Sequence, residues 1–269
     1  MNSFSATHVA AIPPPDMPVG RVIRAYVSEA GCEVLQHLRT PAMSLPFLAL
    51  PSMLYLFFGV LLAGASPDVR SNPNLAAYIF SGWCAYAAMG PALFEIGCGL
   101  AAERDAGLLK LKRALPAPTG SYLGAKLLMS MVFAAIAVGS VIAMALAMGS
   151  VALTAGSLIR LAIVMVVGAV PFAAIGFFIG AYASGSAAPA FANLIFLPML
   201  WLSGLFFPLP KILEPWVVIW PAFHLNQVAL AAAGVAGFRF LDPRIAVAVL
   251  IGVTVLFGGL SVRRLARVG

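Results

Sequence analysis

The stretch LAIVMVVGAVPFAAIGFFIGAYASGSAAPAFANLIFLPMLWLSGLFFPLP, residues 161–210, contains no charged side chain. A helix that crosses the hydrocarbon core of a membrane needs about 20 mostly apolar residues, so this stretch is long enough for two. The glycine and proline of ASGSAAPA, residues 183–190, are typical of a turn between them. Four other uncharged runs are each long enough for one helix: residues 40–67, 71–94, 127–159 and 245–262.

The composition as a whole agrees with a membrane protein. Hydrophobic residues make up 62% of the chain and charged residues only 9%, with a mean hydropathy of +1.01, whereas about a quarter of a soluble domain is charged. The runs are apolar throughout, which favours helices over the alternating strands of a membrane barrel. We therefore predict an all-α integral membrane protein with six transmembrane helices, near residues 43–64, 75–100, 121–148, 159–182, 190–207 and 244–260.

The basic residues are unevenly divided between the two sides that these six spans define. Eleven Lys and Arg lie on the side of the two termini, and five lie on the other side. Because an excess of Lys and Arg marks the cytoplasmic side, we expect both termini in the cytoplasm and the chain in the inner (plasma) membrane, surrounded by lipid. The net charge of +7 follows from this bias, so no nucleic-acid partner is predicted.

The N-terminal region divides into two parts. Residues 1–18 have no basic start followed by an apolar core, so we expect a disordered cytoplasmic lead rather than a signal peptide. Residues 19–40 predict an amphipathic helix along the inner membrane surface; the alternative is a helical flank of the first span. Residues 41–269 then form the transmembrane domain. The apolar residues that recur every three or four positions in the amphipathic helix are Val19, Val22, Ile23, Tyr26, Ala30, Val34 and Leu38.

Charge is concentrated in one loop between the second and third spans. ERDAGLLKLKRALPAPTGSYLGAK, residues 103–126, carries seven of the 25 charged residues. Leu108, Leu111 and Leu115 lie at helical spacing, and the prolines of PAP follow them. This pattern predicts a short amphipathic helix within the loop at about 101–120. From charge alone, either something docks on this helix or the loop is an anchor that only fixes the orientation of the spans.

This loop resembles the first cytoplasmic loop of permeases of the ABC-2 type. There a Glu, a polar residue and a Gly precede a leucine-rich basic helix, one or two prolines, and a Gly-Lys pair that opens the third span. In this chain Ala125 interrupts the Gly-Lys pair, and Ala106 stands where a Ser is common. The residues that match the order of the pattern are Glu103, Gly107, Leu108, Leu109, Pro116, Gly124 and Lys126.

A second stretch, LPMLWLSGLFFPLPKILEPWVVIWPAFHLNQVALAAAG, residues 197–234, resembles the fifth span of the same family and the outer segment after it. Because proline interrupts residues 208–243, we expect short re-entrant helices there rather than a seventh span. These helices would shape an outer exit or cover a dimer seam. The candidate gate or exit residues are Ser203, Gly204, Phe206, Phe207 and His224.

The resemblance implies a permease subunit of an ATP-driven exporter of drugs, lipids or glycoconjugates. It further implies a dimer, here expected to be a homodimer, with a separate cytoplasmic ATPase bound through the loop helix. The chain is then not an enzyme and binds no cofactor, and ATP and Mg²⁺ belong to the partner, because GSYLGAKL at 120–127 does not fit a P-loop. The expected coupling residues are Glu103, Arg104, Gly107, Leu108, Leu109, Leu111, Lys112 and Arg113.

Glu95 is the only acid well inside a predicted span. It either faces the permeation path, pairs with Arg104 or a basic residue of the amphipathic helix at 19–40, or has water access at the cytoplasmic end. The scattered His and Cys residues predict no metal site. The leading alternative function is an ion- or proton-coupled secondary transporter, which would need several such acids or internal repeats. A membrane-embedded enzyme would need clustered catalytic side chains, and no such cluster is visible.

Overall fold

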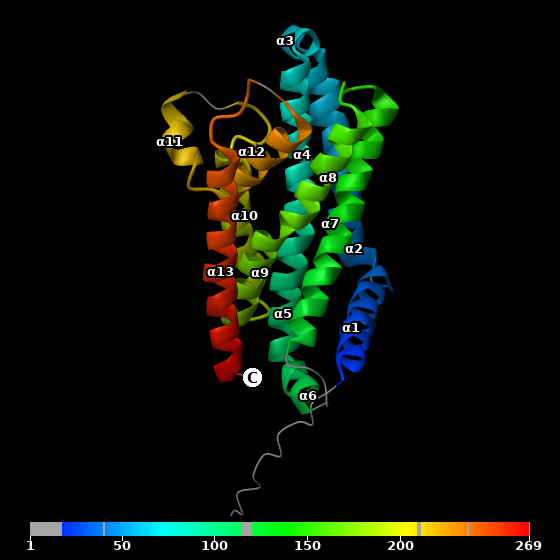
Figure 1. The fold of residues 1–269 in the computed structure, drawn as a ribbon. Coiled ribbons are helices and arrows are strands. Elements are labelled where there is room, and N and C mark those ends of the chain that lie inside the picture. The colour runs from blue at the N-terminus through cyan, green and yellow to red at the C-terminus, as the bar shows by residue number, and fades with distance from the viewer. Residues whose placement is uncertain (1–17, 40, 115–119, 209–210, 236, 269) are drawn as a thin grey trace, which may run out of the picture.

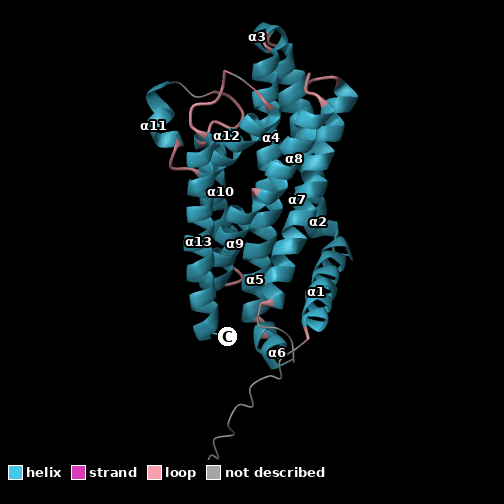
Figure 2. Cartoon of the chain, viewed as in Figure 1, coloured by secondary structure: helices cyan, strands magenta, loops and turns pink. Residues whose placement is uncertain are grey.

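The computed structural model describes residues 18–39, 41–114, 120–208, 211–235 and 237–268. Over these residues the chain is helical, with no strand, and the long helices form one upright bundle (Figures 1 and 2). The predicted lead at 1–18 lies outside the described residues except for Pro18, and so does the proline segment after the loop helix. The all-α membrane fold class is confirmed.

Five helical segments are long and apolar enough to cross a membrane, and each overlaps one predicted span. The first joins α2 (Pro41–Leu54) to a π-helix, η1 (Tyr55–Leu62), and a 3₁₀ turn, η2 (Ala63–Ala65). The second joins α4 (Pro73–Gly90), η3 (Pro91–Glu95) and α5 (Ile96–Asp105) and is the most buried. The others are α7 (Ser121–Met148), α8 (Ala155–Val167) joined to α9 (Ala169–Tyr182), and α13 (Pro243–Val268).

The fifth predicted span, 190–207, coincides with α10 (Ala188–Leu202), which has only 15 residues. At 1.5 Å per residue it is about 22 Å long, less than the hydrocarbon core. It ends early because the chain turns at Ser203 and Gly204, and Gly204 has a φ of +63° that favours glycine. The helix nevertheless packs against α5 and α9 and carries the chain from one end of the bundle toward the other (Figure 1).

The two ends of the bundle differ in character. We call the end with α6 (Leu108–Ala114), the start of α7 and the end of α13 the basic end (Figure 1). The opposite end carries α3 (Pro67–Ser71). The segment predicted to form short helices, 208–243, holds η4 (Lys211–Leu213), α11 (Glu214–Val217) and α12 (Pro221–Ala233), which lie toward this opposite end.

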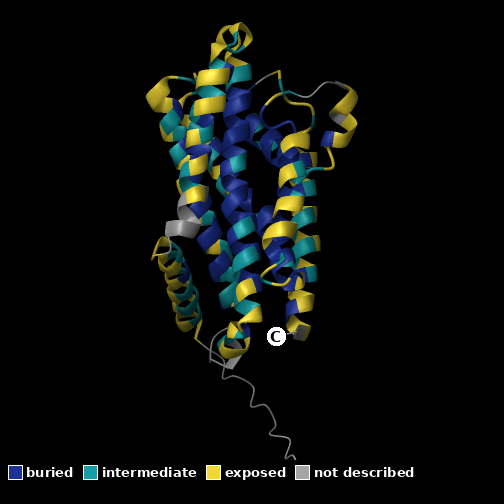
Figure 3. Ribbon diagram, turned by 180° about the vertical axis from the view of Figure 1, so that it is seen from behind, coloured by how far each residue is buried: buried dark blue, intermediate teal, exposed yellow. Residues whose placement is uncertain are grey.

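The amphipathic helix is α1 (Val19–Arg39), and it packs against the first half of α7. The Tyr26 ring lies so close to Gly120 and Gly124 that a Cβ at either glycine would meet it within 2.7 Å. His37 meets Phe133 edge-on with ring centroids 5.9 Å apart. The predicted apolar face is therefore divided: Val22, Tyr26, Ala30 and Val34 are half-buried, whereas Val19, Ile23 and Leu38 are exposed (Figure 3).

Small residues let the central helices approach closely. A Cβ added to Gly176 would lie 2.7 Å from the carbonyl oxygen of Ala92, and one added to Gly180 would lie 2.7 Å from Leu100. Real Cβ atoms do not approach this closely, so α9 packs against η3 and α5 only with glycine at these positions. This contact fixes the end of α9 beside the end of α5, where the candidate site lies.

Candidate functional site at the basic end of the bundle

A buried lysine joins three helices at the basic end. Lys126, in the second turn of α7, has a side chain that is 0% exposed. Its Nζ lies 3.0 Å from Glu33 Oε2 of α1 and 2.9 Å from Glu103 Oε1 of α5. A buried ammonium is tolerated only when carboxylates or other acceptors surround it. The pairing therefore holds α1, α5 and α7 together at a single point.

The loop helix α6 is tied to the same point. Lys112 Nζ contacts the Glu29 carboxylate and lies 3.3 Å from Glu33 Oε1, so Glu33 bridges two lysines. Tyr122 donates its hydroxyl hydrogen to Glu103, and its ring centroid lies 4.4 Å from Lys112 Nζ, within the range of a cation–π contact. We call the whole group the charge cluster: Glu29, Glu33, Glu103, Lys112, Tyr122 and Lys126.

The electrostatics of the charge cluster keep Lys112 positively charged. Partial burial lowers the pKa of its ammonium group, but the hydrogen bond and charge of Glu29 and the charge of Glu33 outweigh burial, so the net pKa is raised. The cluster holds three carboxylates and two ammonium groups. Opposite charges within hydrogen-bond distance on four helices make it a stiff connection between α6 and the transmembrane bundle.

A second connection joins α5 to the turn between α9 and α10. Arg104 donates from Nη1 to the carbonyls of Gly180 and Ala181, at 3.0 and 2.7 Å, and from Nη2 to that of Ala183 at 2.7 Å. These carbonyls end α9 and lack partners within the helix. Asp105 Oδ2 accepts a 2.6 Å hydrogen bond from the backbone N–H of Gly185. We call this pair of side chains and the turn they hold the α5–α9 clasp.

The loop helix itself presents two different faces. Gly107, with a φ of +76°, turns the chain from α5 into α6. Leu109 faces inward and is 7% exposed, whereas Leu108 and Leu111 point outward and are 42% and 65% exposed. Leucines that project into solvent from a short, anchored helix form an apolar surface suited to a protein partner.

The structure therefore divides the eight predicted coupling residues by role. Leu108 and Leu111 form an outer surface, whereas Glu103, Arg104, Leu109 and Lys112 hold α6 and α5 in place, and Gly107 forms the turn. Arg113 lies in α6, but its side chain is outside the described part of the chain.

Sequence reasoning missed the two acids that α1 contributes to the charge cluster. Glu29 and Glu33 lie one turn apart on α1, which was interpreted as a helix with an apolar face and a basic face. Two acids at this spacing share one face of a helix. That pattern was the available signal, and it predicts a basic partner on a neighbouring helix.

Glu95 is buried in the bundle and forms no ion pair with a described residue. Its residue is 7% exposed, and among the described residues neither carboxylate oxygen has a hydrogen-bond partner. The ion pair with Arg104 that the sequence allowed is not formed, because Arg104 turns toward α9. The side chain lies inside the bundle, because η3 is packed between α7 and α9. An ionised carboxylate is costly in such surroundings.

The candidate gate residues of the opposite end are mostly packed inside. The carbonyl of Gly204 accepts a hydrogen bond from the buried Tyr78 hydroxyl, and Phe206 packs on Trp83 with ring centroids 4.2 Å apart. His224 Nε2 lies 2.8 Å from the carbonyl oxygen of Val218. Ser203 is also buried, and Phe207 is exposed. These contacts hold the end of α10 and the start of α12 against the bundle.

The part of the chain that the structure describes contains no group of three His, Cys, Asp or Glu residues placed to hold a metal ion. A family model described as ABC-2 type transporter matches residues 31–240. The chain belongs to the ABC-2 type transporter family. In this ABC-2 permease the matched region begins within α1 and ends beyond α12. It contains the α5–α9 clasp and every residue of the charge cluster except Glu29. No curated protein matches the chain.

Proposed function

We propose that this ABC-2 permease is the membrane subunit of an ATP-driven exporter, bound to a separate cytoplasmic ATPase through α6. The observation that carries the proposal is the division of α6 into two faces. Leu108 and Leu111 project outward, while Leu109 and Lys112 fix the helix to the bundle. A mere topology anchor needs only the charges, and it has no use for exposed leucines on an anchored helix.

The distribution of charge supports an orientation for this subunit. Most of the Lys and Arg residues lie at the basic end of the bundle, so this end faces the cytoplasm of a cell with the permease in its inner (plasma) membrane. Both termini then lie in the cytoplasm. When the short helix α10 is counted as a crossing, the bundle has six crossings. The last of them, α13, then ends at the basic end, in agreement with an even number of spans.

The geometry provides a route by which ATPase motion would reach the spans. A displacement of α6 acts through Lys112 and Glu33 on α1, and through Glu33 and Lys126 on α7. Because α6 follows directly from α5, the same displacement acts through Arg104 on the end of α9 and the start of α10. Motion of α6 would in this way displace four packed helices, α1, α7, α9 and α10, rather than change the conformation of the loop alone.

The expected protein partners are the ATPase and a second copy of the permease. The ATPase supplies the ATP and Mg²⁺ site, and the permease contributes no catalytic residue. A second copy completes the path as a homodimer. Large apolar side chains along the first span and α10 remain exposed for this copy or for lipid, among them Phe57, Leu61, Leu194 and Trp201. The few polar residues in the spans favour a hydrophobic or amphipathic drug, lipid or glycoconjugate.

The test is co-purification of the full-length permease from native membranes in mild detergent. Wild type is expected to retain an ATPase with a P-loop, and Leu108→Asp/Leu111→Asp is expected to lose it. The matched control is Ile212→Asp/Leu213→Asp, which changes two exposed apolar residues toward the opposite end and should retain the ATPase.

Retention of the ATPase by the Leu108 and Leu111 variant would place the contact elsewhere and reject α6 as the coupling helix. Absence of any ATPase with wild type, under conditions that preserve other transporter complexes, would reject the exporter proposal. An ion- or proton-coupled secondary transporter would then be the function to test, with Glu95 as its first candidate residue.

A further inference from the structure

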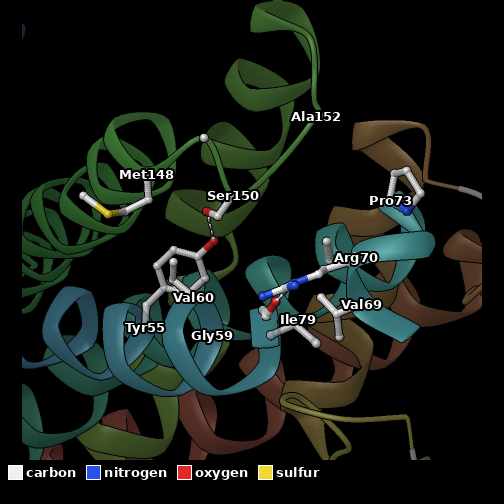
Figure 4. A pocket seen from close by; sticks show the side chains of 13 residues that line it. Tyr55, Gly59, Val60, Val69, Arg70, Pro73, Ile79, Met148, Ser150 and Ala152 are labelled. Atoms are coloured by element: carbon white, nitrogen blue, oxygen red, sulfur yellow. Dashed lines mark hydrogen bonds between the residues drawn. The ribbon is translucent and has the colours of Figure 1, made fainter. Parts of the chain in front are cut away.

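A cavity lies at the opposite end of the bundle, far from the charge cluster. It has a volume of about 360 Å³, is open to one side, and is lined by the ends of the first three spans and by α3. Ligand pockets in proteins have volumes of about 300–1,000 Å³, so the cavity is large enough for a small ligand or one lipid headgroup. Figure 4 shows side chains from these elements converging on it.

The backbone of the first span makes room for this cavity. Gly59 lies in η1, and a Cβ there would meet the Tyr55 ring at 2.5 Å. The absence of that Cβ lets the Tyr55 ring lie across the floor, where its hydroxyl shares a 2.8 Å hydrogen bond with Ser150 Oγ. Gly149, with a φ of +60°, ends α7 and turns the chain so that Ser150 lines the cavity.

Arg70 supplies the only charge among the described residues that line the cavity. Its Nε donates to the carbonyl of Gly64 at 2.8 Å, which fixes the guanidinium group at the rim, and Figure 4 shows it directed into the cavity. Within the described chain no carboxylate lies within ion-pair distance of Arg70, and its two Nη groups make no hydrogen bond. Two adjacent N–H groups on a fixed guanidinium match two oxygens of a phosphate.

Apart from Arg70, Tyr55 and Ser150, the side chains that line the cavity are apolar. Val60, Ala76 and Ile79 line it, and Met148 lies at its edge and is exposed. The neighbouring Leu61 and Leu62 of η1 are also exposed, as expected of side chains that face lipid at the end of a span. A ligand that fills this site must therefore place a negative group beside Arg70 and apolar groups against η1 and α7.

We propose that this cavity binds the headgroup of an anionic phospholipid from the leaflet at the opposite end of the bundle. The phosphate pairs with Arg70, and the acyl chains leave the cavity over the exposed side chains of η1. A zwitterionic lipid brings its own cation to neutralise its phosphate. An arginine that forms no ion pair with a described residue therefore favours a lipid whose headgroup carries a net negative charge. The proposal concerns a lipid that stabilises the permease and does not depend on ATPase coupling.

The test measures lipid binding to the purified full-length permease by native mass spectrometry and by the shift of Tm on adding lipid. Phosphatidylglycerol is expected to remain bound and to raise Tm more than phosphatidylcholine does. Arg70→Gln should weaken phosphatidylglycerol binding about fivefold, the effect of one arginine at a charged membrane surface. Ala76→Phe should weaken binding of the same lipid by filling the cavity while leaving Arg70 in place. Arg239→Gln, at an exposed arginine outside this cavity, is the matched control and should bind like wild type.

Several outcomes would overturn the proposal. Equal effects of the two lipids on wild type would show that the headgroup charge is not recognised. Undiminished phosphatidylglycerol binding by Arg70→Gln or by Ala76→Phe would place the lipid elsewhere. An equal rise in Tm with inorganic phosphate or glycerol phosphate would indicate a site for a soluble anion instead. Arg70→Lys, which keeps the charge, guards against a folding defect and should retain most of the preference for phosphatidylglycerol.

Discussion

Lys126 of α7 and Glu33 of α1 form an ion pair of 3.0 Å in which the two side chains are 0% and 3% exposed. Glu33 also contacts Lys112 of α6, so this one carboxylate links the loop helix to the third span. Buried pairs of this kind contribute little net stability when intact, but they become costly when one partner is removed. The following predictions use that asymmetry.

Replacement of the buried lysine should strongly destabilise the permease. Lys126→Met leaves Glu103 without a cation and Glu33 with Lys112 alone, so the free energy of unfolding should fall by about 3–5 kcal/mol. Thermal unfolding of the detergent-solubilised protein would show this as a lower Tm. Adding Glu33→Gln should restore part of the loss, and Lys110→Met, at an exposed position of α6, should leave Tm unchanged. An unchanged Tm for Lys126→Met would contradict the geometry of the charge cluster.

Loss of the α5–α9 clasp should loosen the turn between α9 and α10. Arg104→Gln removes the charged donor from three carbonyls at the end of α9, and each hydrogen bond to a charged group is worth about 1.5–3 kcal/mol. Hydrogen exchange of the backbone amides in residues 183–190 should become faster, while exchange in α12 stays as in wild type. Asp105→Asn should have a smaller effect because this side chain is exposed. Equal exchange in Arg104→Gln and wild type would refute the clasp.

Substitution of the buried acid should have the opposite sign. Glu95 has two buried oxygens without hydrogen-bond partners in the described chain, so Glu95→Met replaces an unsatisfied group by an apolar one of similar length. Such a change removes a desolvation cost of about 1–3 kcal/mol. We expect Tm to be unchanged or higher. A loss of transport with retained Tm would show that Glu95 serves function, whereas a clear drop in Tm would indicate a partner for its carboxyl group.

Stability should fall on acidification because of one histidine. Burial lowers the pKa of His224, and the hydrogen bond to the Val218 carbonyl only partly opposes this. The folded state therefore binds the proton less readily than the unfolded state, whose histidine has a pKa of about 6.5. Stability from neutral His224 is present above that pKa and is lost as the pH falls below it.

The measurement is Tm between about pH 7.5 and 5.5, above and below the ordinary histidine pKa. Wild type should lose stability over this range, and His224→Gln should show a flatter profile. Identical slopes for the two proteins would assign the acid sensitivity to other groups.

Most of the fold could be predicted from the sequence because the uncharged runs are long and the leucines of the loop recur at helical spacing. Uncharged runs placed five of the helices that can cross a membrane, and the leucine spacing placed α6. The shortness of α10 could not be predicted, because the apolar run continues through Leu205 and Phe206 and only the backbone turn at Gly204 ends the helix.

Only the loop residues of the candidate site could be predicted from the sequence. Residues 103–113 were found from charge and resemblance, but their partners on α1 depend on how that helix packs against α7. Glu95 shows the same limit. Its place in a span was clear from the sequence, but whether its carboxyl group meets Arg104, water or neither depends on the direction in which Arg104 turns.

The charge cluster also has a consequence for the order of synthesis. Glu33 is translated 93 residues before Lys126 and 79 residues before Lys112. A nascent chain that has inserted only its first span therefore carries Glu29 and Glu33 on α1 before either lysine exists. Because unpaired carboxylates favour water over lipid, α1 would stay in water, undocked, until the third span is in place. Docking of the first helix would thus be a late step in the biogenesis of this permease.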